Sequence, residues 1–140
     1  MTQNRASEVS REKKQAVRRI VEEDDPGAMV SNAEEDGTRL HEQKLTSSQI
    51  RPIFGMARAI EGMWVSDPAR AYRELLKLRP KLAYQAQRIP EGMPTLRDLL
   101  DPGISAVGNG RDYTEQAERF QRFLDYFEAV LAYHRAAGGK

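Results

Sequence analysis

Basic side chains recur at helical spacing in the middle of the chain, and their pattern indicates the clearest chemistry. At about 100° of rotation per residue, four of them fall within roughly 40° of each other around a helix if any bend at Pro80 is small. These four are Arg70, Lys77, Lys81 and Arg88, with Arg73 alongside. A ridge of this kind would bind a sugar-phosphate chain without reading its bases, and the affinity would fall as salt rises.

The same spacing also fits an ordinary solvated helix face. Arg70 and Lys77 stand four and three residues from Glu74, the separation at which opposite charges pair on a helix. Tyr84, near the ridge, also has two interpretations, because an aromatic ring can stack on a base or pack into a core. These residues alone therefore leave both RNA binding and a solvated surface open.

A second basic group precedes the ridge. Arg51 and Arg58 fall within about 20° of each other on a helix, and Gly55 and Gly62 share the same strip. Since glycine has no side chain, a phosphate backbone could approach this strip closely. The strip is a further candidate for contact with a nucleic acid.

The residue types needed for catalysis or metal binding are scarce. The chain has no cysteine and two histidines, His41 and His134, whereas a metal site needs three or four ligands. The carboxylate clusters at 22–25 and 34–36 fall in sequence expected to be flexible, where their pKa values would not be tuned. No glycine pattern for phosphate binding follows a strand. We therefore expect no enzyme, no metal and no cofactor.

Helix signals dominate the rest of the chain. Thr46 and Gln49 fit a capping box that starts a helix over about 47–64, bent near its start by Pro52. Ser66-Asp67-Pro68 starts the next helix, which Pro80 either kinks or divides at Arg79. This segment ends in the loop at 89–94.

Two further helices complete the pattern. A short helix from Thr95 should stop at Asp101-Pro102-Gly103, because proline cannot extend the hydrogen-bond ladder. After a loop at 108–110, apolar residues at steps of three or four run through a last helix as far as Gly138. With no credible strand pair, the sequence predicts an all-α fold, a compact bundle of about five helices.

The first 44 residues differ from the rest in composition. Residues 1–44 hold 8 Lys/Arg against 10 Asp/Glu, and residues 45–140 hold 14 against 11. We expect 1–44 to be a charged, partly flexible extension, with a marginal helix from Glu8 to Glu23 and a mobile acidic linker from Glu22 to Gly37. Residues 45–140 would form the helical bundle domain. The polar N-terminus and the lack of a long apolar run predict a cytoplasmic protein that does not enter a membrane.

Three segments, taken in order and spacing, carry a resemblance to a known family. They are Leu45-Thr46-Ser47-Ser48-Gln49-Ile50-Arg51, Leu76-Lys77-Leu78-Arg79-Pro80-Lys81-Leu82-Ala83-Tyr84 and the stretch at 123–134, FLDYFEAVLAYH. Together they cover residues 45–140. The chain resembles the small subunit of type III-A CRISPR effector (Csm) complexes.

The resemblance implies a non-catalytic structural subunit of an antiviral ribonucleoprotein. Such a subunit would be present in several copies and contact guide and target RNA, the backbone subunits and the large subunit. On the matched segments it implies RNA-facing roles for Arg51, Lys77, Arg79 and Lys81, with Arg58 as a further candidate. Helical geometry extends this set to Arg70, Arg88, Arg119 and Arg122.

Two features depart from the family pattern, and one alternative function stays open. Pro52 follows Arg51 where an ordinary helix former is expected, and the first 44 residues are longer than the family needs. The alternative is a self-associating helical adaptor that does not bind RNA, and whose Tyr/Phe-rich last helix docks a partner.

Overall fold

The structure is a computed structural model that describes residues 9–140, and this part of the chain folds into helices and no strands. The predicted helix start at Glu8 lies outside the described residues. The helices are α1 (Arg11–Glu22), α2 (Pro26–Glu42), α3 (Ser47–Ile60), α4 (Met63–Ser66), α5 (Pro68–Leu76), α6 (Leu78–Arg88), α7 (Met93–Gly108) and α8 (Tyr113–Ala136). The predicted all-α class is therefore confirmed. None of these helices has a stretch long and apolar enough to span a bilayer.

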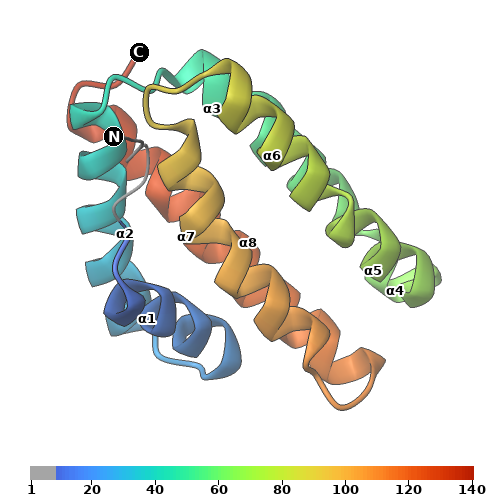
Figure 1. Ribbon diagram of the computed structural model, residues 1–140. Helices are drawn as coiled ribbons and strands as arrows, with labels where there is room; N and C mark the ends of the chain where they lie inside the picture. Colours follow the sequence, from blue (N-terminus) through green and yellow to red (C-terminus); the bar gives the residue numbers. More distant parts are fainter. Residues whose placement is uncertain (1–8) are drawn as a thin grey trace.

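An antiparallel pair formed by α7 and α8 runs through the middle of the bundle. Figure 1 shows α1 and α2 on one side of this pair and α3 to α6 on the other. Helix α1 packs on α7 and α2 on α8, while α6 packs on α7 and α3 on α8. The N-terminal helices and the basic middle segment therefore lie on different sides of a shared core.

The core is richest in aromatic side chains along α8. Phe120, Phe123 and Phe127 are buried, and the rings of Phe123 and Phe127 meet at an angle of 65° with centroids 6.4 Å apart. Phe54 of α3 meets Phe127 edge-on at 5.3 Å, and Trp64 of α4 lies 5.7 Å from Phe120. Tilted and edge-to-face arrangements suit the charge distribution of aromatic rings. The aromatic residues of α8 thus join this helix to α3 and α4.

The capping signals of the middle segment are confirmed. Thr46 and Gln49 form the complete capping box at the start of α3, and Asp67 accepts a hydrogen bond from the Arg70 amide at the start of α5 (3.2 Å). The segment then divides into α5 and α6 at Lys77, two residues before the predicted division. Pro80 explains this position, because its ring clashes with the carbonyl four residues earlier, at Leu76, where α5 ends.

The predicted stop at Asp101-Pro102-Gly103 is wrong, because α7 continues through it to Gly108. Pro102 and Gly103 are both buried. A Cβ added to Gly103 would lie 2.7 Å from Cδ1 of Phe123, so the glycine lets α7 and α8 approach closely. Packing on several sides outweighs the local cost of a helix at these two residues, which is about 3 kcal/mol for proline and about 1 kcal/mol for glycine relative to alanine.

The predicted acidic linker is also wrong, because its residues 26–37 lie within α2. Asp25 caps this helix by accepting a hydrogen bond from the Ala28 amide (3.1 Å), and Pro26 occupies its first turn. Ala33, Gly37 and Leu40 are buried at spacings of four and three. Their helical period was hidden because two of the three have almost no side chain. The boundary between an extension and a domain at residue 45 stays a prediction.

Candidate functional site

Five basic residues of α5, α6 and the single residue between them, Lys77, form one exposed surface, which we call the cationic face. Its members are Arg70, Arg73, Lys77, Lys81 and Arg88, and all five are exposed. Figure 1 shows α5 and α6 following one another along the outer edge of the bundle, so the division at Lys77 does not turn the two halves apart. The face is one stretch of positive charge along two successive helices.

The cationic face is poor in neutralising carboxylates. Within the described residues, its single ion pair joins Lys77 Nζ to Glu74 Oε2 at 3.1 Å, and the Lys77 side chain is 61% exposed. Exposed pairs of this kind are worth less than about 1 kcal/mol. An incoming phosphate would therefore displace Glu74 at low cost, and within residues 9–140 no ion pair holds the other four cations.

Tyr84 lies within the cationic face. It is 57% exposed, and the Arg88 guanidinium lies over its ring, with Cζ 5.6 Å from the centroid. Their separation of four residues places the two side chains one turn apart on the same side of α6. This spacing was readable in the sequence, but whether Tyr84 faces solvent or the core was not.

The second basic group, on α3, is only partly available to bind a ligand. Arg51 is exposed, and apart from the adjoining backbone no atom stands within 4 Å of the positions that a Cβ on Gly55 or Gly62 would occupy. Arg58 instead bridges Glu61 and Glu128, at 3.5 Å each. The open glycine strip is therefore present, with one of its two arginines engaged in ion pairs.

Arg79 faces away from the cationic face and ties α6 to α7. Its Nε lies 2.7 Å from Asp101 Oδ1, and its Nη2 donates to Ser105 Oγ at 2.6 Å. The guanidinium is thus used within the fold, although the residue lies inside one of the family-like segments.

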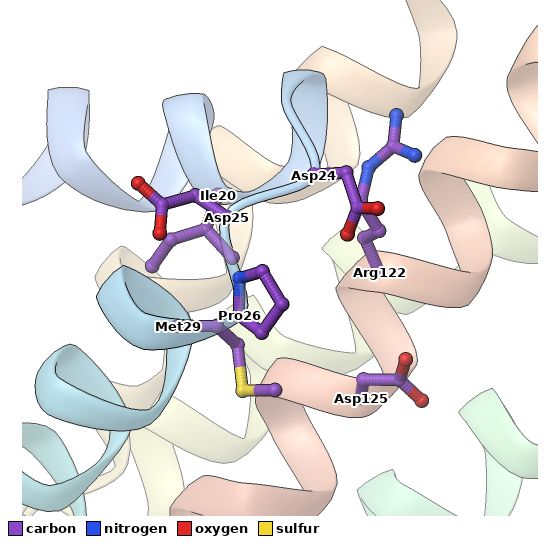
Figure 2. A pocket seen from close by; sticks show the side chains of 7 residues that line it. All are labelled: Ile20, Asp24, Asp25, Pro26, Met29, Arg122 and Asp125. Carbon is purple, nitrogen blue, oxygen red and sulfur yellow. The ribbon is translucent and has the colours of Figure 1, made fainter.

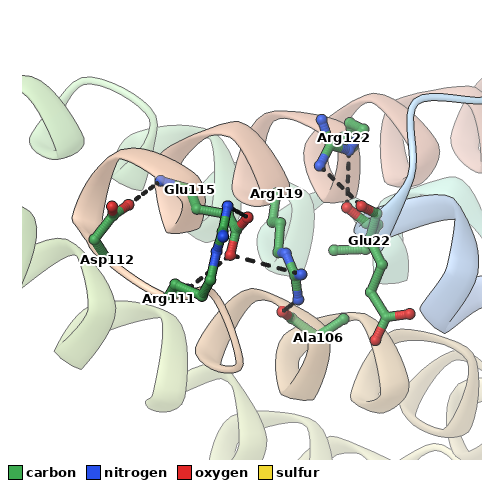
Figure 3. A network of polar contacts seen from close by, with 8 residues as sticks. Glu22, Ala106, Arg111, Asp112, Glu115, Arg119 and Arg122 are labelled. Carbon is green, nitrogen blue, oxygen red and sulfur yellow. Dashed lines mark hydrogen bonds and ion pairs between the residues drawn. The ribbon is translucent and has the colours of Figure 1, made fainter.

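Arg119 and Arg122 are also used within the fold, at the ends of helices (Figure 3). Arg119 donates to the Ala106 carbonyl of α7 at 2.8 Å, and Arg122 Nε donates to the Val21 carbonyl of α1 at 2.8 Å. A second bond joins Arg122 to the Glu22 carbonyl at 3.3 Å. Cations at the last carbonyls of a helix satisfy unpaired acceptors and oppose the helix dipole. The structure therefore does not bring Arg79, Arg119 or Arg122 to the cationic face.

A small cavity of about 90 Å³ opens where α1 turns into α2. Figure 2 shows its carboxylates coming from the α1–α2 connection, at Asp24 and Asp25, and from α8, at Asp125. Among residues 9–140, no group of three or more acidic or histidine side chains is placed to hold a metal ion. His134 is buried with Nε2 2.6 Å from the Leu45 carbonyl, so its role is structural.

A buried polar cluster that the sequence did not indicate joins α1, α2 and α8. Asp36 is 1% exposed; its Oδ2 accepts a hydrogen bond from the Tyr126 hydroxyl at 2.7 Å, and its Oδ1 lies 2.9 Å from Lys13 Nζ. Burial raises the pKa of Asp36 above its ordinary value of 3.8, although the bonds from Tyr126 and Lys13 oppose the rise. Burial likewise raises the pKa of Tyr126 well above 10.0. The cluster anchors the N-terminal helices to the core.

The raised pKa of Asp36 predicts a pH dependence of stability with a definite sign. Between the unfolded and folded pKa values the folded state binds more protons, so this contribution is complete below 3.8 and is lost as pH rises through the folded pKa. The free energy of unfolding of wild type relative to Asp36→Asn should therefore fall as pH rises. Denaturant titrations of both proteins from about pH 3 to about pH 7 measure this difference. A difference that grows with pH would contradict the assignment.

A known protein family matches most of the chain. The family model described as Csm2 Type III-A matches residues 23–140, which include α2 and every helix after it. No curated protein and no solved structure matches the chain significantly.

Proposed function

Because the chain belongs to the Csm2 type III-A family, the small subunit of type III-A CRISPR effector complexes, we propose that its cationic face binds the backbone of RNA. The observation that carries the proposal is the set of five exposed cations on α5 and α6 with a single ion pair among them in the described residues. Guide and target strands both offer the phosphates that such a face would bind.

The geometry suits a single strand lying along the two helices. From Arg70 to Arg88 the helical rise of about 1.5 Å per residue gives a track of roughly 27 Å. Lysine and arginine on such a track neutralise phosphates and release counterions, which gives affinity without sequence preference. A subunit that holds RNA of any sequence needs this property. Arg51 and the open strip on α3 are a secondary contact in the proposal.

The remaining parts of the proposal concern the assembly. Membership of this family implies association with the other subunits of a Csm complex. Members of the family are structural small subunits and are generally non-catalytic. We propose that several copies bind guide and target RNA beside the backbone and large subunits, without any catalytic step of their own. The charge on the cationic face would hold RNA in register, while other surfaces would contact neighbouring subunits.

The alternative of an adaptor that docks a partner through its aromatic last helix has less support. Four of the six Tyr and Phe residues of α8, Phe120, Phe123, Tyr126 and Phe127, are buried in the core of this chain. They are not available to a partner unless the bundle opens. Self-association through another surface would still give an oligomer whose stability does not respond to RNA.

Charge reversal on the cationic face tests the proposal. The variant Lys77→Glu/Lys81→Glu/Arg88→Glu should bind short single-stranded RNA at least tenfold more weakly than wild type. Its plot of log affinity against log salt should be shallower by about 2, because about 0.7 counterion is released per phosphate contact. Fluorescence anisotropy at several salt concentrations measures both quantities.

The matched control carries the same charge change on α1. Arg11, Lys14 and Arg18 are three exposed cations on one side of that helix, across the bundle from the cationic face. Their reversal to glutamate should leave RNA affinity within about twofold of wild type after the general charge effect at low salt is removed. Equal losses in both triple variants, or no loss in either, would count against the proposed interface.

A further inference from the structure

Tyr84 is exposed at a position where the fold gives no reason for an aromatic ring. Tyr84 and Tyr113 are 57% and 52% exposed, whereas Tyr126 is fully buried and Tyr72 and Tyr133 pack against the core. Among the described residues, no other aromatic ring contacts Tyr84. Its ring therefore contributes little to the stability of the bundle.

Tyr84 lies on the same side of the helix as three residues of the cationic face. At about 100° per residue, Lys77, Lys81 and Arg88 all fall within roughly 60° of Tyr84 around the helix. The Arg88 guanidinium lies 5.6 Å from the ring centroid, the distance of a cation–π contact. One side of the ring is thus occupied by a cation, and more than half of the residue still faces solvent.

We propose that Tyr84, supported by Arg88, is a stacking site for one unpaired base of the RNA strand whose phosphates the cationic face binds. The proposal rests on the proposed function, because the cations must first hold the strand along α5 and α6. A base would cover the open side of the ring while Arg88 covers the other. Stacking of this kind accepts any base, since every base has a flat π-surface.

The position of the ring favours an RNA base over an apolar protein partner. An apolar anchor for a protein would be surrounded by other apolar side chains, whereas Tyr84 is flanked by Lys81 and Arg88. Tyr113 lacks this setting: it is similarly exposed, but no cation is recorded over its ring among the described residues. Tyr113 is therefore the matched control.

The experiment compares two ligands of equal length, a short single-stranded RNA and an abasic ribose-phosphate chain, at one salt concentration. Tyr84→Leu should bind the RNA about tenfold more weakly than wild type does. It should bind the abasic chain with the same affinity as wild type, because only the base contact is lost. Tyr84→Phe keeps the ring and should restore wild-type affinity for RNA. Tyr113→Leu should change neither affinity.

A direct readout accompanies the affinities. RNA carrying 5-iodouridine should form a photo-crosslink to Tyr84, mapped by mass spectrometry, because iodouridine couples to an aromatic ring stacked on it. Circular dichroism should give the same melting curve for all three tyrosine variants, since both side chains are largely exposed. An affinity change would then report contact with RNA and not loss of fold.

The outcomes separate this inference from the proposed function. Equal RNA affinity for wild type and Tyr84→Leu, together with a loss in the Lys77/Lys81/Arg88 reversal, would overturn the stacking site and leave the backbone interface standing. If both Tyr84→Leu and the charge reversal bound RNA as tightly as wild type, the stacking site and the backbone interface would both be overturned. A Tyr84→Leu defect of the same size on the abasic chain would overturn the base-stacking role.

Discussion

Replacing Gly37 by alanine should destabilise the protein by about 3 kcal/mol or more, although alanine ordinarily stabilises a helix by about 1 kcal/mol relative to glycine. Gly37 lies in the middle of α2, where that helix crosses α8. A Cβ there would stand 2.5 Å from the Val130 carbonyl oxygen and 2.7 Å from the His134 amide nitrogen. Both atoms are backbone, so the whole of α8 would have to move. Denaturant unfolding followed by circular dichroism measures the loss.

Gly55→Ala is the matched control within the same protein. Gly55 is also in the interior of a helix, yet apart from the adjoining backbone nothing lies within 4 Å of the position its Cβ would take. This substitution should raise the free energy of unfolding by about 0.5 to 1 kcal/mol, the ordinary helix effect. Similar small gains in both variants would mean that α2 does not pack on α8 as described. The N-terminal residues would then be a separable extension, as the sequence boundary at residue 45 predicted.

Replacing Lys13 by methionine should cost about 3 kcal/mol at neutral pH. Lys13 Nζ lies 2.9 Å from buried Asp36 and 2.7 Å from both Glu35 Oε1 and Asn32 Oδ1. Methionine keeps much of the packing of the side chain but leaves the Asp36 carboxylate buried without its cation. Breaking a buried pair by removing one partner is costly because the remaining charge is not compensated. Lys14→Met, at an exposed position on the same helix, should change the free energy of unfolding by less than about 0.5 kcal/mol.

A double-mutant cycle identifies Asp36 as the partner responsible. If the cost of Lys13→Met comes from the stranded carboxylate, then Asp36→Asn should recover a large part of it when both changes are combined. Strictly additive losses would show that Lys13 acts through Glu35, Asn32 or packing. Equilibrium unfolding of the four proteins at one pH completes the cycle.

The two sides of the bundle differ in how their charged residues are used. On the side of α1 and α2, some charged side chains make contacts within the fold: Lys13 pairs with Asp36, and Arg122 caps α1. On the side of α5 and α6, the basic residues of the cationic face point to solvent and have few acidic partners. Substitutions of Lys13, Asp36 or Arg122 should therefore change stability, whereas substitutions on the cationic face should change RNA affinity with little effect on stability.

Local signals in the sequence were sufficient for the helices with explicit caps. Thr46 with Gln49 and Asp67 with Pro68 start helices where their side chains predict, because a cap depends on groups only three residues apart. Local signals were insufficient where the packing partner of a residue is distant in the sequence. Gly103 looked like part of a helix stop and Gly37 like the end of a linker, because the close approach of α8 to both is not visible in the neighbouring sequence.

The basic residues show the same difference between what local spacing predicts and what long-range contacts decide. The period of about 3.6 residues placed Arg70, Lys77, Lys81 and Arg88 on one side of their helices, and all four are exposed. The same reasoning could not separate Arg79, Arg119 and Arg122 from them. Each of these three donates to a group on another helix, at 13 to 101 positions away in the chain. A cation that faces solvent and a cation that donates to a carbonyl carry the same charge and can occur at the same helical spacing. The sequence therefore does not distinguish them.

The sequence by itself therefore determined the helical class, the capped starts of α3 and α5, the basic spacing on α5 and α6, and the family resemblance, because all of these rest on residues near one another or on ordered motifs. Only the tertiary structure decided that α2 and α7 are continuous, that Lys13 and Asp36 meet, and which arginines remain at the surface. The physical reason is that burial and long-range approach set the energy of glycine, proline and charged groups. These conditions arise only when helices distant in the chain pack together.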